Sequence, residues 1–335
     1  MRKDVYEIEY TSKLSLMDTQ IAIKFVKDTF QKELVKKLNL LRVTAPLFVL
    51  PSTGLNDNLS GKEKPVSFKV NDINQEAEIV HSLAKWKRMA LGKYGFKENT
   101  GLYTDMNAIR KDEELDFIHS LYVDQWDWEK VITKEDRNEK YLKNIVNKIY
   151  DALLKTSEVL IDKFPNLKCN LPKEIKFITT EELEDLYPNY SRKERENAIT
   201  KKYGAVFLMK IGNRLKDGKS HDGRAADYDD WNLNGDILLW YDVLNIAFEI
   251  SSMGIRVDKE SLLKQLKDKE EEYKINLPYH QDVLNDRLPL TIGGGIGQSR
   301  MCLYLLNKAH IGEVQVSYWS KEDIELFKSL NIHLL

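Results

Sequence analysis

The chain has 335 residues, 42% hydrophobic and 31% charged, and its 51 basic and 53 acidic side chains leave a net charge of −2. Such a length holds one large α/β domain or two small ones with an ample core. The near-neutral balance argues against nucleic acid as a main partner, because proteins that bind it present a basic face. No apolar run reaches membrane-spanning length, and the first residues lack the apolar region of a signal peptide. We therefore expect a soluble, cytoplasmic protein without a membrane partner.

The chain favours a single domain over residues 1–335, since no internal repeat, low-complexity tract or flexible linker divides it. Its 2 cysteines, Cys169 and Cys302, lie far apart in sequence, which predicts buried reduced thiols and no disulfide framework. The 6 histidines form no H-x-x-x-H or Cys/His cluster, which argues against a zinc site.

The first predicted element is an amphipathic helix over residues 15–38. Apolar side chains recur in it at helical spacing, and charged side chains fill the gaps. The apolar positions are Ile21, Phe25, Phe30, Leu34 and Leu38. A strand-like segment over 40–46 follows and ends in Pro46, a residue that cannot donate to a sheet ladder.

Residues 81–88 crowd three basic side chains around Trp86. A charged run of this kind is usually a solvated face. This one nevertheless lies close to two aromatic segments with functional character, so Lys87 is also a candidate site residue.

Those two segments are predicted strands over 101–110 and 119–129, joined by a charged turn. In the last part of the second strand, polar residues occupy one face and tryptophans the other. The polar residues are Gln125, Asp127 and Glu129. Carboxylates on a strand face are costly if buried without partners. These residues therefore predict the floor of a ligand-binding site. The alternative is that they lie on the solvent-exposed face of a hairpin.

Residues from about 136 to 200 are predicted to form a helical insertion. A helix over 136–164 has a continuous apolar stripe. The pairs Thr179–Glu182 and Ser191–Glu194 are capping-box patterns that predict two further helices. No pattern in this region indicates chemistry.

A buried strand is predicted over 204–212, and a polar loop over 220–230 follows it. The loop gathers aspartates around Arg224, and clustered carboxylates either solvate a loop or hold a divalent cation. The aspartates are Asp222, Asp227, Asp229 and Asp230.

Segments 234–240 and 245–257 are predicted to be neighbouring antiparallel strands. Within the second, Glu249 and Arg256 are single charges in otherwise apolar runs. An isolated charge in such a run is expelled or paired, so both residues are site candidates.

A glycine-rich stretch runs from Pro289 to Arg300 and predicts a short strand, a glycine turn and a helix from residue 297 to about 306. The glycines are Gly293, Gly295 and Gly297. Glycine permits backbone conformations that side chains forbid and a close approach to a ligand. An Arg in the first turn of a helix, beside free backbone N–H groups, suits a polyanion such as a triphosphate. The spacing excludes the P-loop and dinucleotide-binding patterns, and a plain glycine-rich bend is the alternative.

The last stretch, G-x-G-x-G-x-x-R, is similar to motif 3 of the class II aminoacyl-tRNA synthetase catalytic fold. The helix–strand–Pro46 layout resembles motif 1, and Arg110 with the Q-x-D-x-E run resembles motif 2 of the aspartyl and asparaginyl branch. Motif 1 forms the dimer interface in that class, whereas the sequence alone supports a helix packed on its own core equally well. The resemblance implies an α+β (mixed α/β) fold, an antiparallel sheet flanked by helices.

Longer motifs resemble the ammonia-dependent asparagine synthetase (aspartate–ammonia ligase) family, and the likeness runs nearly end to end. These motifs are His81–Arg88, Tyr122–Glu129, Asp227–Trp231, Ser251–Val257 and Gly293–Arg300. One departure is that Trp231 passes almost directly into Asn234, where the best-known members have a longer loop.

The resemblance implies an ATP-dependent ligase that makes L-asparagine from L-aspartate and ammonia through β-aspartyl-AMP. The implied catalytic residues are Asp57, Arg110, Gln125 and Arg300, with Asp57 attracting ammonium and helping to deprotonate it. The implied aspartate-binding residues are Ser82, Lys87, Gln125, Asp127, Ser252 and Arg256. The implied ATP-binding residues are Arg110, Asp229, Asp236, Glu249, Gly295 and Arg300, of which Asp236 and Glu249 are candidate Mg²⁺ ligands.

The resemblance also implies a homodimer formed through the N-terminal helix and strand. One alternative function is the catalytic core of an aspartyl- or asparaginyl-tRNA synthetase, against which the absence of a basic face argues. Another is an inactive paralogue that serves as a binding module, against which the complete set of site residues argues.

Overall fold

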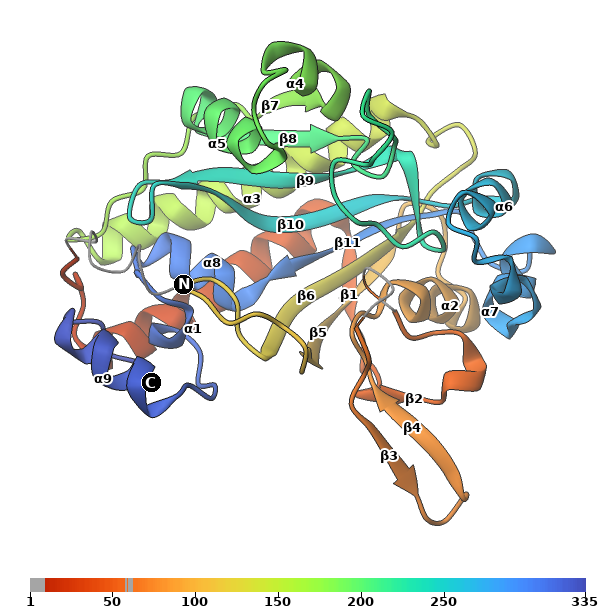
Figure 1. Ribbon diagram of the computed structural model, residues 1–335, viewed down its shortest axis with the longest axis horizontal. Coiled ribbons are helices and arrows are strands. Elements are labelled where there is room, and N and C mark those ends of the chain that lie inside the picture. The colour runs from red at the N-terminus through yellow and green to blue at the C-terminus, as the bar shows by residue number, and fades with distance from the viewer. Residues whose placement is uncertain (1–9, 58, 60–62) are drawn as a thin grey trace.

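The computed structural model describes residues 10–57, 59 and 63–335 (Figure 1). In this part of the chain the main element is an 8-stranded sheet with the strand order β1-β5-β6-β11-β10-β9-β8-β7. Its strands are β1 (Leu40–Arg42), β5 (Gly101–Ile109), β6 (Tyr122–Val131), β7 (Lys176–Thr179), β8 (Ala205–Met209), β9 (Asp229–Tyr241), β10 (Ile246–Arg256) and β11 (Thr291–Gly297). The predicted hairpin of β5 and β6 is confirmed.

The sheet is antiparallel in its centre and parallel at both edges. In the spatial order of the sheet, every neighbouring pair from β5 to β8 is antiparallel. The two outer pairs, β1 with β5 and β7 with β8, are parallel. The expected mixed α/β fold is therefore confirmed, but the sheet is not purely antiparallel. Edge strand β1 can pair with β5 in parallel because the long connection between them, residues 43–100, returns the chain to the same end of the sheet.

One face of the sheet is covered by α1 (Leu16–Leu38), α3 (Glu139–Lys163) and α8 (Gln298–Leu305) (Figure 1). The largest apolar core lies between these helices and the sheet, and it contains Trp126 and Trp128 of β6. At one end of the opposite face, α2 (Ala84–Tyr94), α6 (Lys259–Asp268) and α7 (Pro278–Leu284) pack around a second apolar cluster. The polar face of β6 is on the same side of the sheet as these three helices.

Helix α1 begins where predicted, because the Ser15 side chain accepts a hydrogen bond from the backbone N–H of Asp18. Its buried row differs from the predicted stripe. Ala22, Val26 and Phe30 face the core, whereas Ile21 is 46% exposed. Side chains four residues apart lie nearly above one another on a helix, so adjacent rows of this kind lie close together. Phe30 contacts Trp126, and the row that contains Phe30 is the one that faces the core.

The region 136–200 contains α3, α4 (Thr180–Leu186) and α5 (Arg192–Tyr203), and both predicted capping boxes are present. It also contains strand β7, which the expectation of helices alone did not include. Helix α3 shares the main core with α1, so it is integral to the packing. The division into one domain with an insertion stays a prediction.

A small sheet of β2 (Phe48–Val49), β4 (Gln75–Ile79) and β3 (Ser67–Val70) projects from the body (Figure 1). Short elements complete the described chain: η2 (Pro51–Thr53), η3 (Glu272–Asn276), η4 (Ile311–Glu313) and α9 (Lys321–Ser329). Among the described helices, none combines the length and apolar character needed to cross a membrane.

Candidate active site

The glycine-rich stretch is a strand, which corrects the prediction of a turn. Gly293, Gly295 and Gly297 all belong to β11, and none of them has a positive φ. A Cβ on Gly293 would overlap the carboxylate of Glu129, and one on Gly295 would overlap the side chains of Gln125 and Asp127. Glycine is required here for the space that its missing side chain leaves, because the polar face of β6 lies directly alongside.

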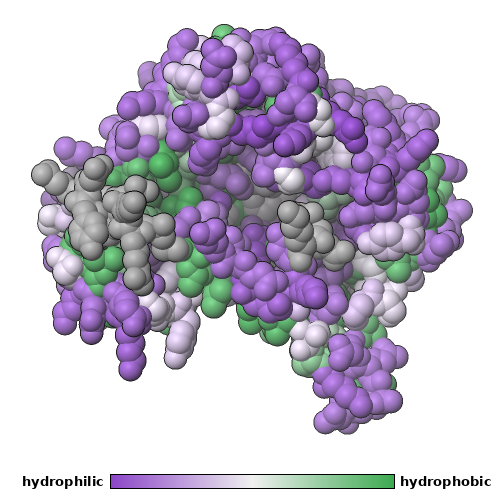
Figure 2. All heavy atoms as spheres, in the orientation of Figure 1, coloured by the Kyte–Doolittle hydropathy of each residue, from purple (hydrophilic) through white to green (hydrophobic). Residues whose placement is uncertain are grey.

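Strands β6, β10 and β11 and the loops around them enclose a cavity of about 500 Å³. The face of the molecule in Figure 2 is hollowed near its centre, and the atoms around the hollow are mostly hydrophilic. All predicted site residues except Asp236 line this cavity. They are Asp57, Ser82, Lys87, Arg110, Gln125, Asp127, Asp229, Glu249, Ser252, Arg256, Gly295 and Arg300.

The first part of helix α2, residues 84–88, is buried, so the interpretation of residues 81–88 as a solvated face is wrong. The helix starts where Ser82 Oγ accepts the N–H of Ala84, and Lys87 is only 1% exposed. Lys87 Nζ donates to Gly294 O at 2.9 Å and lies 3.4 Å from Asp127 Oδ1. Burial lowers the pKa of Lys87, and the Asp127 carboxylate opposes that effect.

Asp127 has a second carboxylate oxygen, Oδ2, that is buried and accepts no hydrogen bond from the described residues. A cation and an unsatisfied carboxylate therefore stand side by side at the cavity wall. This is the arrangement that binds a zwitterion, since an α-carboxylate and an α-amino group need opposite charges at a short distance.

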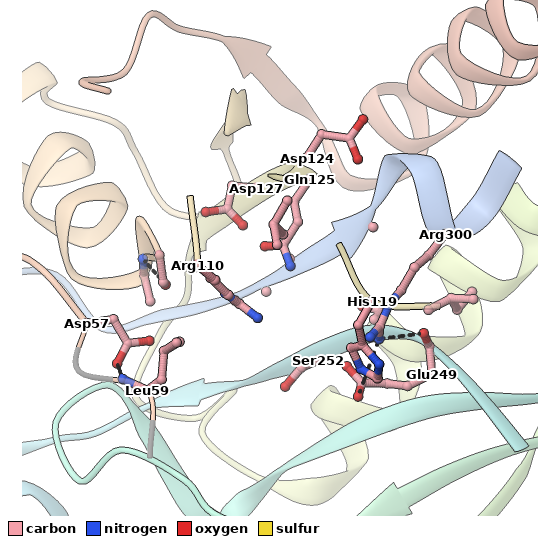
Figure 3. A pocket seen from close by; sticks show the side chains of 18 of the residues that line it. Asp57, Leu59, Arg110, His119, Asp124, Gln125, Asp127, Glu249, Ser252 and Arg300 are labelled. Atoms are coloured by element: carbon pink, nitrogen blue, oxygen red, sulfur yellow. Dashed lines mark hydrogen bonds and ion pairs between the residues drawn. The ribbon is translucent and has the colours of Figure 1, made fainter. Parts of the chain in front are cut away.

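Arg110 and Arg300 approach the cavity from opposite sides (Figure 3). Arg110 follows β5; its Nη2 donates only weakly to His81 O, at 3.5 Å, and its Nε has no partner among the described residues. Arg300 lies in the first turn of α8, as predicted. It donates to Glu249 O at 3.1 Å and lies 3.8 Å from Glu249 Oε2. Both guanidinium groups keep donors available for an anion.

Asp57 lies in the loop after η2 and is 2% exposed. Its Oδ1 accepts the backbone N–H of Leu59 at 2.9 Å, and no ion pair joins it to a described residue. Burial raises the pKa of Asp57, although the charge of Lys85 works against the rise. A buried carboxylate without a cation is costly, and this one borders the cavity.

Arg256 is a cavity residue whose guanidinium is already paired. It donates to both carboxylate oxygens of Glu129, at 2.9 Å and 2.6 Å, and its Nη1 donates to Asp229. Burial opposes its charge, yet Glu129 and Asp229 outweigh burial and hold the pKa of Arg256 well above its ordinary value. The three side chains form a buried set of ion pairs in the wall.

The aspartates of the 220–230 loop do not cluster around Arg224, which corrects that expectation. Each pairs with a different cation: Asp222 with Arg224, Asp227 with Lys85, Asp229 with Arg256, and Asp230 with Arg137. In the described chain, no group of three or more His, Cys, Asp or Glu residues is arranged to hold a metal ion.

Asp236 lies behind the cavity wall and pairs with Arg224. Burial raises its pKa to about 8 despite the Arg224 charge, and the nearby Glu249 carboxylate adds to the rise. One oxygen of Asp236, Oδ1, is buried without a hydrogen bond from the described residues. Glu249 is partly exposed and faces the cavity.

The cavity also contains side chains that the sequence did not single out as site residues. These include His119, Asp124, Arg224, Tyr228 and Gln315. Asp124 and Tyr228 lie within the family-like motifs, so their position in those motifs is a signal that was available. His119 was predicted to begin the strand over 119–129 but lies in the loop before β6, and Gln315 belongs to no pattern; only the folded chain brings these two loop residues to the cavity.

Comparison with known proteins gives a match to a family model described as AsnA, aspartate-ammonia ligase, over residues 17–331. An aspartate–ammonia ligase of Fusobacterium nucleatum is 60% identical over 326 residues, 97% of this chain and 99% of the relative. One of Clostridium tetani is 61% identical over 328 residues, 98% of this chain and 96% of the relative.

Solved structures confirm the expected fold class. An Entamoeba histolytica asparaginyl-tRNA synthetase in complex with asparaginyl-adenylate has a TM-score of 0.64 at 14% identity, covering 91% of this chain and 68% of that one. A Pyrococcus horikoshii asparaginyl-tRNA synthetase has a TM-score of 0.63 at 16% identity, covering 89% and 68%. These likenesses concern the fold alone. The family model and the relatives, which span nearly the whole chain, show that it belongs to the aspartate–ammonia ligase (AsnA) family.

Proposed function

We propose that this protein is an ATP-dependent ligase that converts L-aspartate and ammonia into L-asparagine, with AMP and diphosphate as the other products. The observation that carries the proposal is one cavity that combines a zwitterion site, two arginines with available donors, and the buried carboxylate of Asp57, which has no partner ion among the described residues. These groups match the charges of aspartate, ATP and ammonium.

Aspartate binds with its α-carboxylate at Lys87 and its α-amino group at Asp127 and Gln125. Ser82 and Ser252 line the same part of the cavity and offer hydroxyl groups. Arg256 lines the same cavity, with its guanidinium held by Glu129 and Asp229. The aspartate side chain then extends toward Arg110.

In the first step, an oxygen of the β-carboxylate attacks the α-phosphorus of ATP, and the bond between that phosphorus and the diphosphate oxygen breaks. Two anions must approach each other, so cations have to offset their repulsion and the charge of the transition state. Arg110 holds the α-phosphate and the aspartyl carboxylate, and Arg300 holds the terminal phosphate. Gly295 lets the backbone of β11 approach the nucleotide.

In the second step, ammonia attacks the carbonyl carbon of β-aspartyl-AMP and AMP leaves with the bonding electron pair. Ammonium must lose a proton before its nitrogen can attack. Asp57 pairs with the ammonium ion and accepts that proton, and its raised pKa makes it a stronger base than an ordinary carboxylate.

Mg²⁺ binding is proposed for the carboxylates of Asp236 and Glu249. Mg²⁺ usually binds to one or two protein carboxylates together with substrate phosphates. Asp236 Oδ1, which accepts no hydrogen bond from the described residues, and the carboxylate of Glu249, which faces the cavity, fit that donor set. When bound, the ion neutralises phosphate charge. Asp229 is held by Arg256 as Asp236 is held by Arg224, but Asp229 has no buried oxygen that lacks a hydrogen-bond partner among the described residues.

A homodimer through α1 and β1 is proposed from the apolar residues that these elements leave exposed. Leu16, Met17 and Ile21 of α1 and Leu41 of edge strand β1 are all exposed large hydrophobic residues. Exposed apolar surface next to an unpaired strand edge is typical of an interface between subunits.

The test is to measure AMP formation from ATP with purified protein. We expect AMP to form only with both aspartate and ammonia present, without any effect of added tRNA. Attachment of aspartate or asparagine to tRNA would replace the proposal with a tRNA synthetase. Absence of any aspartate-dependent ATP–diphosphate exchange would indicate an inactive paralogue.

A further inference from the structure

Asp124 is a buried carboxylate that the proposed chemistry does not use. It precedes Gln125 on β6, so its side chain lies on the face of the strand that also carries the tryptophans. In Figure 3, Asp124 points away from the cavity centre while Gln125 points toward it. The residue is 7% exposed. A charge placed there is costly unless partners hold it.

The partners of Asp124 come from three parts of the chain. Oδ1 accepts the backbone N–H of Ser299 at 3.0 Å and Gln315 Nε2 at 3.3 Å. Oδ2 accepts Ser299 Oγ at 2.8 Å and Lys27 Nζ at 3.1 Å. Lys27 belongs to α1, Ser299 to α8, and Gln315 to the segment after η4.

These contacts supply a cap that α8 lacks. Its N-cap residue is Gly297, which has no side chain to accept a hydrogen bond. Asp124 accepts the N–H of Ser299, a residue of the first turn, and places a negative charge at the positive end of the helix. The cap therefore comes from the neighbouring strand instead of the preceding residue.

The next residue after Ser299 is Arg300. Asp124 therefore joins the strand that carries Gln125 and Asp127 to the backbone that carries Arg300. The reach of a guanidinium group depends on where its own helix turn lies. If the first turn of α8 frays, Arg300 loses its defined position relative to β6.

We propose that Asp124 is a positioning residue for Arg300, and that Lys27 extends this support to α1. The inference rests on the proposed role of Arg300 in holding ATP. It implies that loss of Asp124 weakens nucleotide binding selectively. The aspartate side of the cavity is carried by Lys87, Gln125 and Asp127, and among the described residues no hydrogen bond or ion pair joins their side chains to this network.

The experiment compares KM values for ATP and for aspartate in ATP–diphosphate exchange. For Asp124→Ala we expect the KM for ATP to rise roughly five- to tenfold, the equivalent of a lost helix cap, and the KM for aspartate to change less than about twofold. Lys27→Met and Ser299→Ala keep the backbone cap and are expected to raise the KM for ATP by smaller factors. Asp124→Asn retains an acceptor for the Ser299 N–H and is expected to recover part of the loss.

The matched control is Ser320→Ala, which removes the side-chain cap of the peripheral helix α9. It is expected to lower thermal stability as much as Asp124→Ala while leaving both KM values unchanged. Equal rises in both KM values for Asp124→Ala, or no rise at all, overturn the inference. If Asp124→Ala does not fold, the same comparison of the KM for ATP with the KM for aspartate is made with Asp124→Asn and Ser299→Ala.

Arg300→Ala separates this inference from the function on which it rests. If the KM for ATP rises with Arg300→Ala but not with the Asp124 variants, only the positioning role of Asp124 is refuted. If Arg300→Ala leaves the KM for ATP unchanged, the proposed role of Arg300 is wrong and the inference falls with it.

Discussion

Gly295→Ala tests whether the glycines of β11 exist to leave room for the polar face of β6. The new Cβ would overlap the side chains of Gln125 and Asp127. The backbone cannot move away easily, because Gly295 is paired with Ser252 of β10 on one side and with Asp127 of β6 on the other. The two polar side chains must therefore leave their positions.

The magnitude follows from the cost of overpacking, which is typically about 1–3 kcal/mol. Since about 1.4 kcal/mol corresponds to tenfold in an equilibrium constant, the KM for aspartate is expected to rise between about fivefold and 150-fold. The KM for ATP should also rise, because Gly295 is the residue at which the backbone of β11 is proposed to approach the nucleotide.

The assay is aspartate-dependent ATP–diphosphate exchange, measured beside the melting temperature of each variant. The control is Ile296→Val, the next residue on β11, whose fully buried side chain lies in the apolar core. This substitution is expected to lower the free energy of unfolding by about 0.5–1.5 kcal/mol and to leave the KM for aspartate unchanged. A Gly295→Ala variant with a KM for aspartate within about twofold of wild type would refute the reasoning.

Three further variants are expected to give the following outcomes. Asp57→Asn should lower kcat/KM for ammonia by at least about 100-fold while keeping aspartate-dependent ATP–diphosphate exchange; loss of that exchange contradicts the assigned role. Because burial raises the pKa of Asp57, its ionised form destabilises the fold above its unfolded pKa of about 3.9. The same variant should therefore melt at a higher temperature than wild type at pH 7, with the difference vanishing as the pH falls toward 4. Lys85→Met removes a cation 2.9 Å from the buried Asp227, and urea unfolding should show that the free energy of unfolding falls by about 3–5 kcal/mol. An unchanged urea midpoint would mean that His280 and Lys274 are sufficient to stabilise the Asp227 carboxylate. Leu41→Glu should convert a dimer to a monomer in light scattering, whereas an unchanged mass excludes β1 from the interface.

Local patterns of the sequence were sufficient to predict most elements. The alternation of polar residues and tryptophans placed Gln125 and Asp127 on the face of β6 that the cavity uses, because side chains in a strand alternate by covalent geometry. The capping boxes at Thr179 and Ser191 are present because each involves only residues three apart.

The glycine turn was mispredicted because glycine has two uses that look alike in sequence. It permits positive φ, and it also leaves the space of a missing Cβ. Only the neighbouring β6 shows that the second use applies at Gly293 and Gly295. Likewise, the aspartates near Arg224 looked clustered because their partners, such as Lys85 and Arg137, lie far away in sequence.

The sequence by itself determined the periodic elements, the family motifs and the types of charge at the site. Only the tertiary structure decided which charges meet: Lys87 with Asp127, and Asp124 with Lys27 and Ser299. It also decided that Asp57 has no partner ion among the described residues and that Asp236 lies behind Arg224. The physical reason is that an ion pair depends on a separation of a few ångströms. That separation is set by strand order and helix packing, which no local pattern contains.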